Sequence, residues 1–165
     1  MDNLQNKPLR VLYALDIYEK DKCIIDEASL RLFPQNTEFH IITVIPKVLD
    51  TTGFLIGVIN ELNQNQLDAA KSKLMQLVSP LKTQYHFASA VIIDNSVVSA
   101  ISEYVDHQHI DCVIINGQKH GLWERHLTGN QEKIVGMLDC DVIISKKSYL
   151  NRINKQAQKK RELIH

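Results

Sequence analysis

The stretch RVLYAL at residues 10–15 decides the fold class of this 165-residue chain. It is too short and too apolar for a surface helix, and Asp16 closes it. Runs of this kind are typical of parallel strands that are buried on both faces. We therefore expect a sheet that helices cover on both sides.

Outward from this run, the chain alternates between strand-like and helix-like segments. Further strands are predicted at 38–45, 86–93, 110–115 and 141–145. Helices are predicted at 21–33, at about 67–81 after an irregular stretch from 46 to about 60, at about 97–105 behind a cap at 94–96, and at about 134–138. Pro80 is expected to end or bend the second of these helices. The pattern predicts a single doubly wound α/β domain with a five-stranded, mostly parallel sheet, but it does not distinguish a Rossmann-like from a flavodoxin-like strand order.

Composition agrees with a soluble globular protein, since 44% of the residues are hydrophobic and 23% are charged. No apolar run approaches the roughly 20 residues of a membrane-spanning helix. The polar N-terminus does not resemble a secretory signal. Cys23, Cys112 and Cys140 lie far apart in the sequence, and the last two are in or beside apolar runs that favour buried thiols. We expect a protein of the reducing cytoplasm.

Charge is distributed unevenly, although the net charge is zero. Residues 146–165 hold seven basic residues and one acid, so they carry +6 and residues 1–145 carry −6. We divide the chain into a flexible N-terminus at 1–8, a domain at 9–146, and a basic amphipathic tail at 147–165 that is expected to be helical. Three interpretations of this tail stay open: a solvated helix, a helix that docks on a partner subunit, or a segment that binds nucleic acid or an anionic membrane.

Three stretches resemble the universal stress protein family: RVLYALD at 10–16, HIITVIP at 40–46, and NGQKHGLWERHLTGNQEKIVGMLDCDVIIS at 116–145. TGFL at 52–55, ahead of a long helix, is similar to the family's universal stress protein A subgroup. The resemblance covers about residues 9–146. It implies the adenine nucleotide alpha hydrolase-like, Rossmann-like fold and a non-catalytic, cytoplasmic role in stress endurance.

The glycine loop of this family bears on whether a nucleotide binds. The ATP-binding members carry Gly-x2-Gly-x9-Gly-(Ser/Thr), whose backbone amides and helix N-terminus hold phosphate. In this chain Gly117 is present, but His120 occupies the second glycine position, and Gly129-Asn130 comes one residue early without a hydroxyl. Loss of the glycines is similar to the non-ATP-binding subgroup. The resemblance thus implies a degenerate nucleotide site and no cofactor.

An ATP- or AMP-binding protein with slow ATP hydrolysis stays open as an alternative. The resemblance would then place the nucleotide contacts at Asp16, Val44, Gly117, Gly129 and Asn130. Asp16 could equally cap the turn after its strand. Ile17 and Tyr18 replace small residues of the family at the next two positions, and we expect them to crowd the mouth of the site.

Other candidate chemistry is weak. GxxxxGKS/T and GxGxxG motifs are absent, and no serine-rich pyrophosphatase loop follows the first strand. His120 and His126 could touch an anion or act as acid–base groups, but we expect them to be surface residues of the loop. Trp123 could stack on a base, but we expect it to be a hydrophobic anchor that fastens the loop to the domain or to a second subunit. His107 and His109, with two nearby aspartates, could form a metal site, but such a helix-to-strand turn is typical of solvated polar residues. We predict that the protein is not an enzyme.

The last strand, DVIIS at 141–145, suggests how the protein associates. Family members commonly dimerise through this strand, so the resemblance implies a homodimer seam at Val142, Ile143 and Ile144. An apolar strand at a sheet edge has to be paired or covered. The alternative is that the tail covers this edge.

Overall fold

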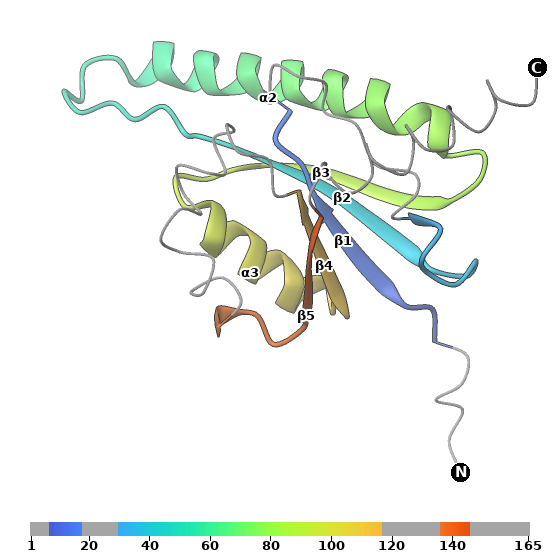
Figure 1. Cartoon of the computed structure of the whole chain (residues 1–165). Helices are drawn as coiled ribbons and strands as arrows, with labels where there is room; N and C mark the ends of the chain where they lie inside the picture. The colour runs from blue at the N-terminus through green and yellow to red at the C-terminus, as the bar shows by residue number, and fades with distance from the viewer. Residues whose placement is uncertain (1–6, 18–29, 117–135, 146–165) are drawn as a thin grey trace, which may run out of the picture.

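The computed structural model describes residues 7–17, 30–116 and 136–145 (Figure 1). Residues 21–29 of the predicted helix at 21–33, and residues 134–135 of the one at 134–138, lie outside these residues. So do Cys23, the glycine loop with His120, Trp123 and His126, the basic tail at 147–165, and all but two residues of the N-terminal segment at 1–8.

Five strands form one sheet, as predicted. They are β1 (Arg10–Ala14), β2 (Glu38–Ile45), β3 (His86–Ile93), β4 (Cys112–Asn116) and β5 (Asp141–Ser145). Their order is β3-β2-β1-β4-β5, and every neighbouring pair is parallel. The chain moves outward from β1 to β3, then crosses back to β4 on the other side. This is the Rossmann-like order rather than the flavodoxin-like one.

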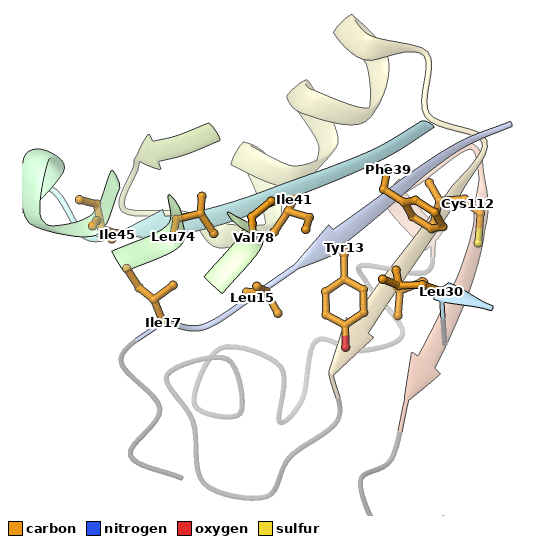
Figure 2. Packing of buried hydrophobic residues seen from close by; sticks show 13 residues of the cluster. Tyr13, Leu15, Ile17, Leu30, Phe39, Ile41, Ile45, Leu74, Val78 and Cys112 are labelled. Carbon is orange, nitrogen blue, oxygen red and sulfur yellow. The ribbon is translucent and has the colours of Figure 1, made fainter. Parts of the chain in front are cut away.

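Two long helices cover opposite faces of the sheet, which makes it doubly wound (Figure 1). They are α2 (Ile56–Val78), followed by the 3-10 turn η1 (Ser79–Leu81), and α3 (Val97–Gln108). Alternate residues of a strand point to opposite faces. Val11, Tyr13 and Leu15 accordingly pack in the cluster with Leu74 of α2, shown in Figure 2, whereas Leu12 and Ala14 pack with Ile101 of α3.

The ends of the helices follow local chemistry. Ser96 caps α3 as predicted, because its side-chain oxygen accepts a hydrogen bond of 3.2 Å from the backbone N–H of Ser99. α2 ends at Val78, and Pro80 lies in the 3-10 turn that follows, so the prediction for Pro80 is confirmed.

The start of α2 differs from the prediction. The helix begins at Ile56, so the irregular stretch expected to reach about residue 60 is too long. The carboxylate of Asp50 accepts hydrogen bonds from the backbone N–H groups of Thr52, Gly53 and Leu55, at 2.8, 2.9 and 2.8 Å, and so closes the loop before the helix. Gly53 has a φ of 75°, which glycine adopts without strain. The segment from 46 to 55, whose order the sequence left open, is folded.

Candidate functional site

The strand order places a topological switch point at the carboxyl ends of β1 and β4, where a crevice is expected. From β1 the chain leads to β2 on one side, and it returns to β4 on the other, so the connections after β1 and β4 leave in opposite directions. Ligands of open α/β sheets bind outside the carboxyl ends of the strands at such a switch point. Pairing of β1 with β4 ends at Ala14 and Ile115.

Two of the five predicted nucleotide contacts lie together at this edge. Ala14 of β1 pairs with Ile42 of β2, so two further residues bring Asp16 level with Val44. Val44 is 8% exposed and Asp16 is half-buried. The other three contacts, Gly117, Gly129 and Asn130, lie outside the described residues. The structure therefore brings two of the predicted contacts to the same edge of the sheet, and their role in binding a nucleotide stays a prediction, as does that of the other three.

Ile17 lies in the core rather than across the crevice. Its side chain is fully buried in the cluster below α2, near Ile45 and Leu74 (Figure 2). The amine of Lys73, on α2, donates a hydrogen bond to the carbonyl oxygen of Ile17. These contacts draw the end of β1 toward α2, so the expectation that Ile17 crowds the mouth of the site does not hold. Tyr18 lies outside the described residues.

Two of the four candidate metal ligands near the end of α3, His109 and Asp111, have structural roles. His109 adopts a left-handed conformation, with a φ of 51°, and caps the end of α3. The carboxylate of Asp111 accepts a hydrogen bond of 2.8 Å from the backbone N–H of Arg10. Across residues 7–17, 30–116 and 136–145, no group of three or more histidines, cysteines or acids could hold a metal ion. Nothing in this turn supports a metal site.

The two described cysteines have the properties of structural thiols. Cys112 is buried, as predicted, and burial raises its pKa to about 11. Cys140 is half-buried, and burial raises the pKa of this thiol as well. Because the thiolate is the nucleophile, a raised pKa makes both groups weaker nucleophiles at neutral pH.

A buried polar network at the amino ends of the strands was missed by the sequence analysis. His40 of β2 is 3% exposed, and its Nδ1 lies 3.0 Å from the hydroxyl oxygen of Tyr104 on α3. Its Nε2 lies 3.5 Å from a carboxylate oxygen of Glu38, whose other oxygen accepts a hydrogen bond of 3.2 Å from Nε of Arg10. Burial lowers the pKa of His40 more than Glu38 raises it, so the imidazole is neutral at pH 7. A histidine inside the apolar run EFHIITVI was the available signal.

A shallow cavity of about 480 Å³ adjoins this network at the amino ends of β2 and β3. Its lining includes Thr37, Glu38, His86 and Phe87. The cavity therefore lies at the edge of the sheet opposite the crevice, and it belongs to a different region from the nucleotide contacts that the sequence predicted.

Comparison with known proteins supports the fold. No protein-family model matches the chain, and no curated protein matches it. Among solved structures, the universal stress protein UspA from Lactobacillus plantarum gives a TM-score of 0.63 at 17% identity, over 84% of this chain and 99% of that one. The hypothetical protein MJ0577 gives 0.64 at 16% identity, over 84% and 96%. A universal stress protein in complex with cAMP gives 0.50 at 15% identity, over 84% and 97%.

These likenesses and the strand order first define the class, a doubly wound α/β protein with a switch point between β1 and β4. Within that class, the chain has the universal stress protein fold. In the part of the chain that the structure describes, no helix is long and apolar enough to cross a membrane.

Proposed function

We propose that this chain is a universal stress protein that acts in the cytoplasm, without catalysis, through contacts with itself and with other proteins. The observation that carries the proposal is the all-parallel β3-β2-β1-β4-β5 sheet, together with its likeness to universal stress proteins over 84% of the chain. Cys112 is buried, which raises its pKa to about 11, and His109 and Asp111 have structural roles, so these three groups are accounted for without catalysis.

We further propose that this protein does not depend on a nucleotide. Backbone amides approach phosphate oxygens closely only where side chains do not obstruct them, which is why phosphate loops use glycine. His120 stands where the ATP-binding pattern has its second glycine, and Gly129-Asn130 is displaced by one residue. The sequence thus lacks the phosphate half of the site, even though Asp16 and Val44 lie level at the crevice.

An adenine-nucleotide receptor is the second candidate. A protein of the same fold has been solved in complex with cAMP, and the crevice of this chain carries an aspartate and a buried valine at adjacent strand ends. Such a receptor would bind ATP or AMP through Asp16 and Val44 on one side and Gly117, Gly129 and Asn130 on the other. Slow ATP hydrolysis would then be expected.

Calorimetric titration of the folded full chain with Mg-ATP, AMP and cAMP separates the two candidates. We expect no binding up to millimolar ligand. Micromolar binding would replace the nucleotide-independent proposal with the receptor. If the side chain of His120 is the obstruction, His120→Gly should create or tighten affinity for ATP. His126→Gly, a histidine-to-glycine change elsewhere in the same loop region, is the control and should not change that affinity. A His120→Gly variant that still fails to bind would remove the glycine explanation.

We also propose that β5 forms the homodimer seam. β5 is an edge strand, and in the described chain only β4 pairs with it. Ile143 and Ile144 are each 40% exposed, whereas Val142 packs against the cluster on the α3 side. Exposed apolar edges invite pairing with another chain. Analytical ultracentrifugation should show a dimer that Ile143→Lys converts to a folded monomer, while Met137→Lys, at a residue that is 55% exposed but outside the strand, should leave it intact. A monomeric parent protein would end this proposal.

A further inference from the structure

The start of α2 carries an exposed apolar surface that the proposed function does not use. Its side chains, which we call the α2 patch, are Phe54, Leu55, Ile56, Val58 and Leu62, exposed by 92, 51, 60, 54 and 44%. Val58 and Leu62 are four residues apart, so they lie on one side of the helix, and Phe54 is in the loop directly before it. Figure 1 shows this end of α2 beyond the carboxyl ends of the strands. A cluster of large apolar side chains exposed at one end of a helix marks a contact site.

Hydrogen bonds hold the α2 patch in a defined shape. Asp50 accepts hydrogen bonds from three backbone N–H groups and from the hydroxyl of Thr52, at 2.8 Å. The side-chain amide of Asn63 bonds both backbone groups of Val48, at 2.9 and 3.0 Å, and thereby fastens the loop to the helix. These bonds hold the backbone on both sides of the exposed Phe54 in place. Binding to a preformed surface avoids the entropy cost of ordering it.

The acids closest in sequence to the α2 patch, which lie between Lys47 and Lys71, favour a basic occupant. Residues 48–70 contain Asp50, Glu61 and Asp68 and no lysine, arginine or histidine, so this stretch carries −3. The tail at 147–165 contains six basic residues and one acid, so it carries +5. The tail also has its own apolar residues at helical spacing: Tyr149, Leu150, Ile153, Ala157, Leu163 and Ile164. Both its apolar character and its charge complement the patch.

We propose that the tail at 147–165 docks on the α2 patch of its own chain. All strands are parallel, so the end of β5, where the described chain stops, and the start of α2, which follows β2, lie at the same edge of the sheet. β2 and β5 are three strand positions apart, which is about 14 Å. Nineteen residues span about 28 Å even when fully helical, so the tail is long enough.

Tethering favours this occupant over a second copy. A short linker gives a segment an effective concentration in the millimolar range, so a weak contact suffices within one chain. A symmetric contact between two α2 patches would instead bring −3 against −3. Docking in the same chain would also keep the basic residues of the tail away from nucleic acid and anionic membranes.

Trypsin cleavage of the full chain tests the proposal, because trypsin cuts after the lysines and arginines of the tail. The test variant is Phe54→Ser with Val58→Ser, and the matched control is Met75→Ser, at a residue of the same helix that is 59% exposed but lies outside the patch. Circular dichroism first establishes that all three proteins are folded. Cleavage tracks the undocked population, so the patch variant should lose its tail roughly tenfold faster than the parent and the control.

Carbodiimide coupling supplies the second readout, because it joins a carboxylate to a nearby lysine amine. Docking predicts links from Lys155, Lys159 or Lys160 to Glu61 or Asp68 in the monomer band of the parent protein, and their loss in the patch variant. Equal cleavage in all three proteins would overturn the proposal, as would links that form only between two chains. So would tail cleavage that ignores the patch substitutions and slows when RNA or anionic vesicles are added, since the tail would then serve those partners.

Discussion

The two halves of α2 both carry apolar residues but lie in opposite environments. In the second half, Ala70, Leu74 and Val78 are buried against the sheet. In the first half, the large apolar side chains at 56, 58 and 62 are between 44 and 60% exposed. The second half of α2 therefore packs on the core, and the first half exposes apolar side chains at the surface.

The difference shows that a helix can be held in two ways. The second half is stabilised by burial of an apolar stripe, which is the usual source of helix stability in proteins. The first half is held by side chains that bond to the backbone of the preceding loop, from Asp50 and Asn63. Four predictions compare the stability of the packed core with that of the exposed start of α2.

The largest effect is expected from Leu74→Ala. Leu74 is 2% exposed in the cluster with Ile45 and Ile17, so its loss removes buried apolar surface and leaves a cavity. We expect the free energy of unfolding to fall by about 2–5 kcal/mol. The neighbouring Met75 is 59% exposed, and Met75→Ala should change that free energy by less than about 0.5 kcal/mol. Denaturant unfolding of both variants makes the comparison, and equal losses would mean that burial does not separate the two faces of this half.

Burial also explains how much of the fold was predictable. The ends of β2, β3 and β5 were predicted to the residue, because strands buried on both faces appear as continuous apolar runs. The start of α2 was missed because its exposed turns have no apolar face toward a core. Its support comes from Asn63 bonding Val48, fifteen residues away, which no local pattern reveals. The strand order was likewise undecided, since periodicity does not encode neighbours.

The candidate site was predictable to a similar extent. Asp16 and Val44 were named from the resemblance to the family, and the register of β1 with β2 brings both to one edge of the sheet, while their role as nucleotide contacts stays a prediction. The direction of Ile17 was not predictable, because it depends on its contact with α2. His40 was overlooked because its partners, Tyr104 and Arg10, come from distant parts of the chain.

The next largest effect is a loss of stability in mild acid, and it should come from His40, which is buried in the core. Burial holds the pKa of His40 below its ordinary value of 6.5, with Glu38, Arg10 and Tyr104 facing the ring. The unfolded chain therefore binds a proton that the folded chain resists. This contribution to stability is fully present above pH 6.5 and is lost as the pH falls toward the lower pKa of the folded state.

Urea unfolding at about pH 7.5 and about pH 5.5 measures this contribution. The parent protein should lose stability between the two values, and His40→Gln, which has no titrating ring, should lose less. His86→Gln, at an exposed histidine of the neighbouring strand, is the control and should behave like the parent. A variant at His40 with the full pH dependence would assign the effect to other groups.

A smaller, local effect is expected from Asp50→Asn in the loop before α2. The hydroxyl of Thr52 and the backbone N–H groups of Thr52, Leu55 and Gly53 bond this carboxylate and lower its pKa. An amide side chain replaces only part of these bonds. Hydrogen exchange at Thr52, Gly53 and Leu55 should become several-fold faster, while exchange at Leu74 should not change.

The same bonds set a pH threshold different from that of His40. Because the pKa of folded Asp50 lies below the ordinary 3.8, its contribution is present above pH 3.8 and disappears as the pH falls through the folded value. Local protection, corrected for intrinsic exchange, should therefore survive at pH 5.5 and fail in stronger acid. Asp68→Asn, which changes an exposed acid of the same helix, is the control. Faster exchange at Leu74 in the Asp50 variant would show that the two halves open together.

The last prediction has the smallest expected effect and tests whether the two halves of α2 unfold together. Gly57 lies in the first turn of α2, and an added Cβ there would meet no atom within 4 Å. Gly57→Ala should stabilise the helix by about 0.5–1 kcal/mol, since alanine loses less backbone entropy than glycine. If the first half opens independently, only the amides near residues 56–62 gain protection and the melting temperature stays unchanged. If the melting temperature rises as well, the halves unfold as one unit. Gly53→Ala should act in the opposite direction, because its φ of 75° strains any residue that has a Cβ.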